Sequence, residues 1–151
     1  MQNVYFSKTK PVKTPTRANL RDAGIDFFIP DDFNDRKPLT LKHGDDVVIP
    51  SGIYMRQVDL DMMKFENKSG IAVKKGLIIG ACIIDNEYQG ELHINLIKAT
   101  SSECTIEAGD KIAQGIFYEP KYRDLKEHNI EDLYDAKSDR GDGKFGSSGD
   151  K

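Results

Sequence analysis

Two aspartates lie at the ends of apolar runs, where a carboxylate can hold a water molecule or a hydrated metal ion. Asp26 precedes the run Phe27-Phe28-Ile29, and Asp85 directly follows Ile83-Ile84. A carboxylate at the mouth of a buried strand is suited to general-base chemistry or to a hard cation such as Mg²⁺. The alternative is that each aspartate only caps a turn. Both are therefore candidates for water activation or metal binding.

Three other places combine glycine or arginine with polar groups in a way that suits phosphate. Lys68-Ser69-Gly70 precedes a candidate short helix, and the N–H groups at a helix start attract anions. Gly146-Ser147-Ser148-Gly149 would let backbone amides approach a phosphate closely, and the planar guanidinium of Arg140 suits bidentate contact. None of these segments has the Walker spacing of a P-loop, which disfavours ordinary kinase or ATPase machinery.

The composition argues against several classes of protein. The chain has 151 residues and a net charge of −3, which disfavours a nonspecific nucleic-acid binder. The first residues show no signal segment, and no apolar stretch approaches the roughly 20 residues that span a bilayer. Cys82 and Cys104 fit no zinc pattern. We expect one cytoplasmic domain (host cytoplasm for a viral protein) with no nucleic-acid or membrane partner.

The elements that must position these residues read mainly as short strands. Val47-Val48-Ile49 and Ile53-Tyr54-Met55 flank the turn signal Pro50-Ser51-Gly52. Residues 92–96 alternate between apolar and polar, and residues 112–117 follow another turn signal. Leu77 to Ile84 is almost wholly apolar, which indicates a strand buried on both faces or between subunits. Many short strands favour an all-β sandwich or barrel.

Helical signals are weak, and the end of the chain differs from the rest. One short helix is predicted after Lys68, with Ser69 as its N-cap and Gly76 just past its end. Residues 135–151 contain four glycines and one large apolar residue, Phe145. Such a segment cannot bury enough surface to order itself. We therefore predict a β domain over residues 1–134 and a flexible arm over 135–151, with a frayed terminus as the alternative.

Five segments in order resemble the motifs of the trimeric dUTP pyrophosphatases (dUTPases), and they run from position 22 to 149. They are Asp22-Ala23-Gly24-Ile25-Asp26, Lys68 to Gly76, Ile84 to Glu91, Gly109-Asp110-Lys111-Ile112-Ala113-Gln114, and Arg140 to Gly149. The order makes the resemblance far more specific than any single motif. The compact chain and the run Ile79-Gly80-Ala81-Cys82 resemble phage and bacterial members.

The resemblance implies a dUTPase-like β-jelly roll, a distorted barrel with one short helix and a flexible C-terminal arm that closes over the active site. It implies a homotrimer whose shared active sites hydrolyse dUTP to dUMP and pyrophosphate, which lowers dUTP and supplies dUMP for dTMP synthesis. Asp85 would orient and activate the water that attacks the α-phosphorus. Mg²⁺ would bridge the phosphates, and Asp26 would hold that ion through a water molecule.

The remaining residues implied by the resemblance bind the substrate. Tyr88 would pack on the deoxyribose and exclude a 2′-hydroxyl, and the backbone around Leu77 to Ile84 would contact uracil. The substrate-binding positions within that run are Ile79, Cys82 and Ile84. The α- and β-phosphates would be held by Lys68, Ser69, Gly70 and Gln114. In the arm, Phe145 would stack on uracil, and Gly146 would also lie at the substrate. The γ-phosphate would be bound by Arg140, Ser147 and Ser148.

This chain departs from the family pattern in the base- and phosphate-binding segments. Lys68 and Asn67 stand where the family usually has arginine and proline, so the charge is kept while the bidentate fork is lost. Cys82 replaces a frequent glycine, Ile79 an asparagine often used to read uracil, and Lys144 a usual glycine. We therefore expect base recognition to rely more on the backbone.

Two alternatives come from other functional classes. dCTP deaminases share the fold, but their chemistry needs a glutamate as proton shuttle, and counting from Gly90 places Asn95 at that position. An amide cannot shuttle protons in that way. The second alternative is a non-catalytic regulatory or structural jelly-roll module. The presence of Asp26 and Asp85 together with Phe145 disfavours it.

Overall fold

The computed structural model describes residues 3–59, 61–138 and 141–142, and it divides the chain into two units, residues 1–120 and 121–151. Each unit is described by itself. The arm predicted over residues 135–151 belongs to the second unit, and most of it lies outside the described residues. The boundary expected after residue 134 therefore stays a prediction.

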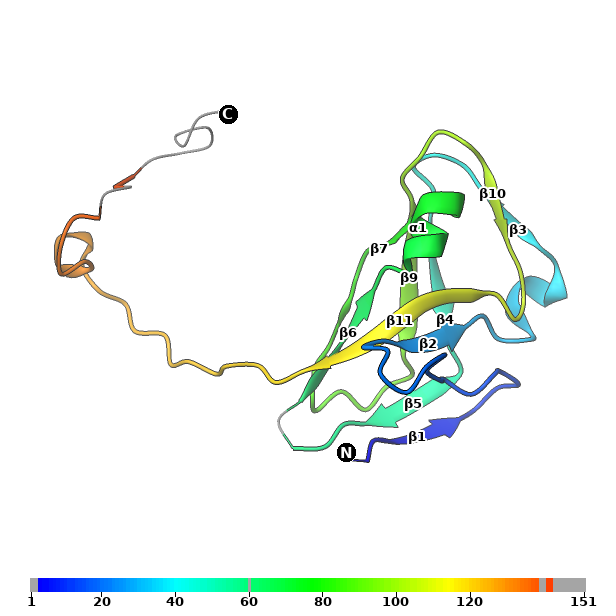
Figure 1. The fold of residues 1–151 in the computed structure, drawn as a ribbon, viewed down its shortest axis with the longest axis horizontal. Coiled ribbons are helices and arrows are strands. Elements are labelled where there is room, and N and C mark those ends of the chain that lie inside the picture. Colours follow the sequence, from blue (N-terminus) through cyan, green and yellow to red (C-terminus); the bar gives the residue numbers. More distant parts are fainter. Residues whose placement is uncertain (1–2, 60, 139–140, 143–151) are drawn as a thin grey trace. The chain divides into compact units, whose positions relative to one another are not determined.

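Short strands dominate unit 1, as the frequent glycine, proline and aspartate between apolar runs predict (Figure 1). The strands are β1 (Tyr5–Lys8), β2 (Ile25–Phe28), β3 (Leu39–Leu41), β4 (Asp46–Pro50), β5 (Ile53–Arg56), β6 (Met62–Glu66), β7 (Leu77–Ile79), β8 (Ile83–Ile84), β9 (His93–Lys98), β10 (Cys104–Ile106) and β11 (Lys111–Tyr118). The helical elements are η1, a 3-10 segment (Phe33–Arg36), and α1 (Ser69–Lys75).

The strands pair into open antiparallel sheets. The largest has the order β2-β11-β6-β8, a second has the order β4-β9-β7, and β1 pairs with β5 and β3 with β10. Among the described residues no sheet closes into a barrel. The predicted strand, turn and strand around Pro50 are confirmed as β4 and β5, but the two strands belong to different sheets. Gly52 makes this turn with φ of 72°, a conformation that favours glycine.

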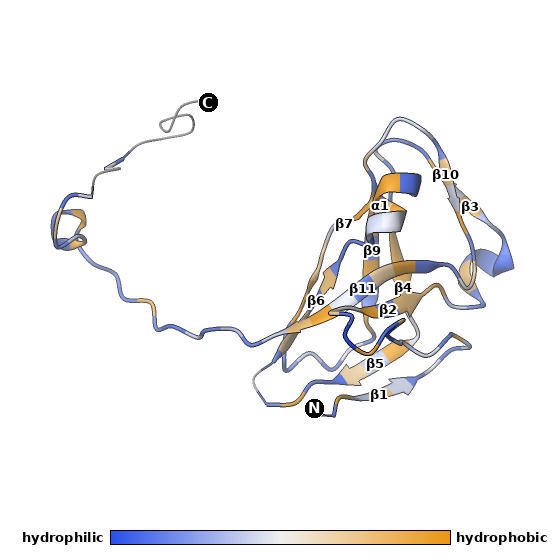
Figure 2. Cartoon of the chain, in the orientation of Figure 1, coloured by the Kyte–Doolittle hydropathy of each residue, from blue (hydrophilic) through white to orange (hydrophobic). Residues whose placement is uncertain are grey.

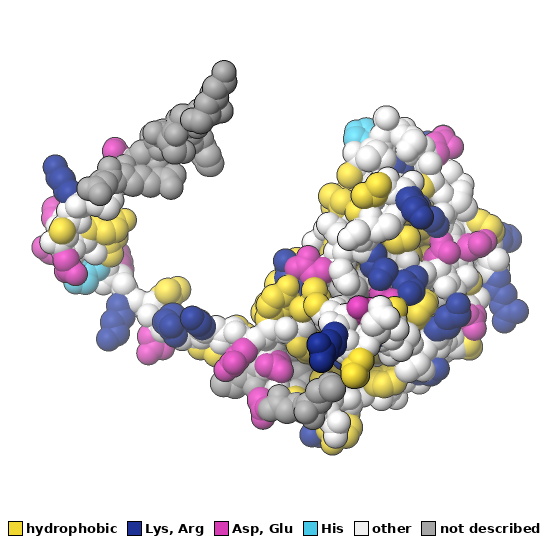
Figure 3. Space-filling view, viewed as in Figure 1, with side chains coloured by type: hydrophobic (Ala, Val, Ile, Leu, Met, Phe, Trp, Pro, Cys, Tyr) yellow, Lys and Arg dark blue, Asp and Glu magenta, His cyan; other side chains and the backbone are white. Residues whose placement is uncertain are grey.

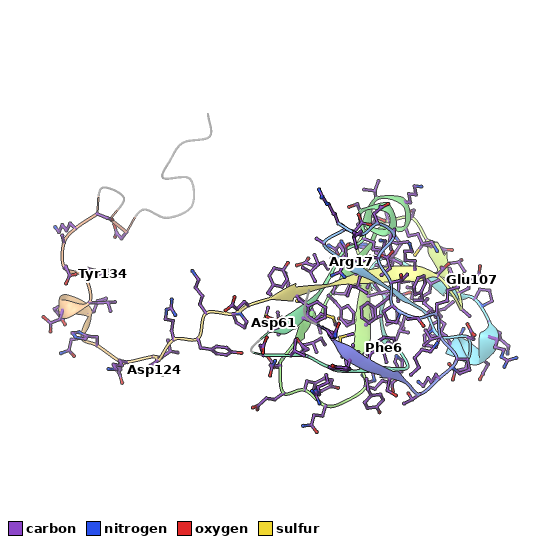
Figure 4. All side chains as sticks on the ribbon, turned by 60° about the horizontal axis from the view of Figure 1, so that its bottom comes forward. Phe6, Arg17, Asp61, Glu107, Asp124 and Tyr134 are labelled. Carbon is purple, nitrogen blue, oxygen red and sulfur yellow. The ribbon has the colours of Figure 1, made fainter. Side chains whose placement is uncertain are left out.

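The hydrophobic core lies between these sheets, and the alternating segments form strands that bury one face against it. Phe27 of β2 and Phe65 of β6 meet edge to face, with ring centroids 5.0 Å apart. Ile94 and Leu96 of β9 are fully buried, whereas His93 on the same strand is exposed. Figure 2 shows apolar residues along the strands of this unit, and Figure 4 shows the side chains packed densely between them. Alternation in the sequence therefore places His93 and Asn95 on the outer face of β9, whereas Lys98 at the strand end is buried.

Two local expectations were wrong in detail. The N-cap of α1 is Lys68 rather than Ser69, and no side-chain capping hydrogen bond is formed there. The helix ends as predicted at Gly76, which is left-handed at φ 61°. The apolar run from Leu77 to Ile84 is not one strand buried on both faces. It divides into β7 and β8 in different sheets, and Ile83 is 49% exposed in the chain.

Unit 2 contains the 3-10 turn η2 (Ile130–Asp132). Its described side chains are exposed, including large apolar ones such as Leu125 and Tyr134. Within residues 3–59, 61–138 and 141–142, no helix has the length and apolar composition needed to cross a bilayer.

Candidate active site

Asp26 is a buried carboxylate held between two lysines. It lies on β2, and its side chain is 4% exposed. Lys68 donates to its Oδ1, and the Nζ of Lys111 lies 2.7 Å from its Oδ2. Burial alone would raise the pKa of Asp26, but the hydrogen bonds and charges of Lys111 and Lys68 outweigh it and hold the pKa below its ordinary value. The carboxylate is therefore ionised, and the three side chains together carry one net positive charge.

The start of α1 adjoins this ion-paired group. Ser69 and Gly70 form the first turn and are exposed, directly after Lys68. The N–H groups of Ile71 and Ala72 both donate to the Lys68 carbonyl, at 2.9 and 2.8 Å. The amides of the first turn have no acceptor within the helix itself. Figure 3 shows Lys and Arg side chains gathered over α1 and β11 in this view. The surroundings suit an anion.

Gln114 is placed beside Asp26 by the strand pairing of the largest sheet. On β11 it pairs with Asp26 of β2 on one side and with Glu66 of β6 on the other. Its Nε2 donates to the Asn67 carbonyl at 2.9 Å. A Cβ on Gly24 would fall 2.2 Å from the Gln114 Oε1, so only glycine fits beneath this side chain. We call Asp26, Lys68, Ser69, Gly70, Lys111 and Gln114 the β2–α1 cluster.

Asp85 lies in a second place, at the turn that follows β8. Its side chain is exposed, but its backbone is fixed from two directions. The buried Gln57 donates from Nε2 to the carbonyls of Ile84 and Asp85, both at 3.1 Å. The Tyr88 N–H donates to the Asp85 carbonyl at 3.1 Å, which closes the turn. A solvent-accessible carboxylate on a fixed backbone can orient a water molecule.

A pocket of about 220 Å³ opens beside this carboxylate, lined by Ala81, Ile83, Ile84, Asp85, Tyr88 and His93. The Tyr88 hydroxyl donates to the Glu91 carbonyl at 3.0 Å. This contact packs the ring over Gly90, where a Cβ would lie 2.4 Å from the hydroxyl oxygen. His93 Nδ1 lies 2.8 Å from the Glu91 carbonyl, which can only accept. Nδ1 therefore carries a proton, and a neutral ring presents Nε2 as an acceptor.

A larger hollow of about 570 Å³ lies on the other side of the same turn, between the turn and the β1–β5 pair. Phe6, labelled on β1 in Figure 4, is one of its aromatic lining residues, with Tyr5 and Tyr54. Of the predicted site residues it contains only Tyr88. Three of the predicted residues, Ile84, Asp85 and Tyr88, line the smaller pocket.

The predicted site therefore falls into separate parts within one chain. Ile84 pairs with Met63 near the start of β6, five positions before Lys68, and the antiparallel register sets Asp85 one position further away. At about 3.3 Å per residue, this places Asp85 about 20 Å from the start of α1. Among the predicted base-contacting positions, Ile84 lines the pocket, and Ile79 and Cys82 are half-buried just before it. Arg140, Phe145, Gly146, Ser147 and Ser148 lie outside the described residues.

Several residues that shape this region were not predicted from the sequence to act in the site. Lys111 is the second partner of Asp26, and His93 lines the pocket. Gln57, Asn67 and Asn95 bond the backbone of the segment between β7 and Asp85. The alternation of β9 could have placed His93 and Asn95 together on its outer face. The other contacts join residues far apart in sequence and leave no local signal.

Comparison with known proteins adds an independent finding. A sequence model of the dUTPase family matches residues 10–149. A deoxyuridine 5′-triphosphate nucleotidohydrolase of Shewanella piezotolerans is 35% identical over 140 residues, covering 91% of this chain and 87% of that protein. The protein of that name from Mus musculus is 34% identical over 137 residues, with 89% and 77% covered.

Solved structures show the same fold. A dUTPase mutant of Staphylococcus bacteriophage 80alpha with dUpNHpp superposes with a TM-score of 0.82 at 21% identity, covering 99% of both chains. A dUTPase mutant of phage phi11 of S. aureus, described with a structural Mg(II) ion, gives a TM-score of 0.72 at 20% identity, covering 86% of this chain and 99% of that one. The all-β jelly-roll expectation is confirmed.

Proposed function

The chain belongs to the dUTPase family, and from this premise we propose that it hydrolyses dUTP to dUMP and pyrophosphate. The observation that carries the proposal is the exposed Asp85 carboxylate, set on a fixed backbone at the mouth of a pocket lined by Tyr88. Asp85 orients a water molecule and takes up its proton as the water attacks the α-phosphorus. The reaction lowers dUTP and supplies dUMP for dTMP synthesis in the cytoplasm.

The pocket beside Asp85 holds the nucleoside. Tyr88 packs against the deoxyribose, and its ring, held by the Glu91 carbonyl, leaves no space for a 2′-hydroxyl. The backbone at Ile79, Cys82 and Ile84 contacts the uracil edge. One chain offers only about 220 Å³ here, below the roughly 300 Å³ at which small-molecule sites begin. Further walls must come from elsewhere.

Four residues of the β2–α1 cluster, Lys68, Ser69, Gly70 and Gln114, bind the α- and β-phosphates. Lys68, Ser69 and Gly70 offer an ammonium, a hydroxyl and backbone amides, and Gln114 adds a side-chain amide. The net positive charge around Asp26 supports this assignment. Residues 135–151 form an arm that closes over the substrate, where Phe145 stacks on uracil and Gly146 lies beside it. Arg140, Ser147 and Ser148 bind the γ-phosphate.

The active site is shared between copies of the chain in a homotrimer. A general base must approach within about 3 Å of the water it activates. Asp85 and Lys68 of one chain are separated by several times that distance, because β6 lies between them. Asp85 of one copy therefore faces the cluster of another copy. Exposed apolar side chains support such an interface, namely Ile83 in the pocket wall, Ile78 on β7 and Val48 on β4.

Magnesium fits this site as an ion that arrives with the triphosphate. The described residues contain no group of three acidic, histidine or cysteine side chains that could hold a metal by itself. The net positive charge of the β2–α1 cluster repels a free cation. Each Asp26 oxygen accepts one lysine and keeps a further acceptor position, so Asp26 can hold a metal-bound water. When bound, the ion would neutralise negative charge on the triphosphate.

The deaminase alternative receives no support from the contacts of Asn95. Its Oδ1 accepts the Ala81 N–H and its Nδ2 donates to the Val47 carbonyl. The amide is therefore engaged with the backbone, and it has no ionisable proton to transfer.

The function is tested with dUTP, dCTP, dTTP and UTP in the presence of Mg²⁺, with pyrophosphate release as the readout. We expect cleavage of dUTP alone, and its loss in Asp85→Asn. Asp46→Asn is the matched control, because Asp46 is an exposed carboxylate on β4. Release of ammonia from dCTP, or normal turnover by Asp85→Asn, would contradict the proposal.

A further inference from the structure

The segment from Ile79 to Asp85 crosses from one sheet to another. β7 ends at Ile79 beside β9, and β8 begins at Ile83 beside β6. Along this passage and at the strand ends on either side of it, side-chain amides bond the backbone. We propose that the amides of Asn67, Asn95 and Gln57 shape this segment and act as positioning residues for base selection and for Asp85. The inference rests on the proposed function, which assigns both tasks to this segment.

Asn67 and Asn95 hold the backbone on either side of Gly80. The Ile79 N–H donates to the Asn67 Oδ1 at 2.7 Å, and the Ala81 N–H donates to the Asn95 Oδ1 at 3.0 Å. Between them, the Gly80 N–H donates to the Asn95 carbonyl at 3.0 Å. Three successive N–H groups are thus bonded to two asparagines, which fixes the backbone at the end of β7.

The fit around Asn95 is specific to an amide. A Cβ on Gly80 would lie 1.9 Å from the Asn95 Oδ1, so the asparagine fills the space that a side chain at position 80 would need. Its Nδ2 donates to the Val47 carbonyl of β4 at 3.4 Å. One half-buried side chain therefore joins β4, β9 and the passage to β8. A leucine of similar size would keep the packing and remove the acceptor.

Gln57 fixes the other end of the segment. It is 7% exposed, and its Nε2 donates to the carbonyls of both Ile84 and Asp85. Its Oε1 is the one buried side-chain polar atom among the described residues that has no hydrogen-bond partner. Turning the amide over would set Oε1 against two carbonyl oxygens, so the orientation is fixed. An unpartnered buried oxygen is costly, and here it accompanies the two hydrogen bonds that Nε2 donates to the carbonyls of Ile84 and Asp85.

These contacts act on the reaction through geometry. Uracil and cytosine differ in the donors and acceptors on one edge, and a backbone can distinguish them only if its own N–H and C=O groups are held in place. A misplacement of about 1 Å at a reacting centre can cost about a hundredfold in rate. Loss of Asn95 should therefore weaken binding and base selectivity, whereas loss of Gln57 should mainly lower turnover.

The test compares kcat and KM for dUTP and dCTP in the full chain and in Asn95→Leu and Asn95→Asp. The aspartate keeps the acceptor for the Ala81 N–H but loses the donor to the Val47 carbonyl, so it should be impaired less than the leucine variant. The leucine variant should show a rise in KM for dUTP of about tenfold and a similar fall in selectivity. Thr40→Val is the matched control, because it removes a side-chain hydrogen bond of 3.1 Å to Thr105, outside the site.

Two further variants keep the inference open to refutation if Asn95→Leu does not fold. Asn67→Ala, at an exposed position, should also raise KM and reduce selectivity, and Gln57→Met should lower kcat about tenfold at little change in KM. Three results would overturn the inference. They are unchanged selectivity in folded Asn95→Leu and Asn67→Ala, equal losses of selectivity in Asn95→Asp and Asn95→Leu, and a normal kcat in Gln57→Met. A wild type that does not cleave dUTP would instead refute the proposed function.

Discussion

Substituting the two lysines around Asp26 separately distinguishes fold stabilisation from phosphate binding. The Asp26 side chain is 4% exposed, whereas Lys68 is 25% and Lys111 40% exposed. In Lys68→Met or Lys111→Met, one oxygen of the buried carboxylate loses its charged partner while the methylene packing is largely kept. Both variants should therefore be less stable, and only Lys68→Met should bind a triphosphate poorly.

The expected loss of stability follows from the burial of Asp26 and the partial exposure of each lysine partner. A hydrogen bond to a charged group contributes about 1.5–3 kcal/mol, and the partial exposure of the lysines reduces this towards the lower end. Each substitution should lower the free energy of unfolding by about 1.5 kcal/mol. For a chain of this size, the unfolding temperature should fall by roughly 3–6 °C.

Thermal unfolding and calorimetric titration with a non-hydrolysable dUTP analogue measure the two effects. We expect similar falls in unfolding temperature, with a loss of affinity of about tenfold for Lys68→Met and less than about threefold for Lys111→Met. Equal losses of affinity would show that Lys111 also binds phosphate. Unchanged stability in both variants would refute the reasoning about the buried carboxylate.

Three other results are expected. The pKa of Asp26 is lower in the folded chain, so its ion pairs should stabilise the fold above about pH 4. This stabilisation should be lost as the pH falls through the lowered pKa. Asp26→Asn should therefore flatten the acid limb of a pH–stability curve. Gly24→Ala should displace Gln114 and cost about 1–3 kcal/mol of stability, whereas Gly70→Ala, where a Cβ meets nothing within 4 Å, should not; equal unfolding midpoints would contradict this. Removing residues 140–151 should cut turnover severely without changing the unfolding temperature of the rest, and unchanged turnover would show that the arm has no catalytic part.

Much of the fold followed from local patterns. Alternation predicted β9, the glycine and proline signals placed the turn between β4 and β5, and Gly76 marked the end of α1. The division of Leu77 to Ile84 into two strands could not be predicted, because a short apolar run reads the same whether it is one strand or two. The one-residue error at Ser69 arose because lysine is not a favoured N-cap residue.

Site residues could be predicted only within the five segments that resemble family motifs. Asp26 and Gln114 are 88 positions apart and meet as register partners on β2 and β11, as the motif order suggested. Gln57 and Asn95 belong to none of the five segments, and their bonds to the backbone of residues 81–85 depend on how three sheets meet. Such contacts have no signature in sequence. The separation of Asp85 from the β2–α1 cluster likewise appears only when β6 is seen to run between them.

The sharing of one active site between copies of the chain is tested most directly by subunit mixing. Asp85→Asn chains and Lys68→Met chains are unfolded together and refolded at equal ratio. Hydrolysis of dUTP is measured at a substrate concentration well below KM, where the weaker binding expected for Lys68→Met lowers its activity. If Asp85 of one copy works with Lys68 of another, about a quarter of the sites should combine two intact residues and recover activity. Activity no higher than the sum of the separate variants would contradict the shared site and place the whole reaction within one chain.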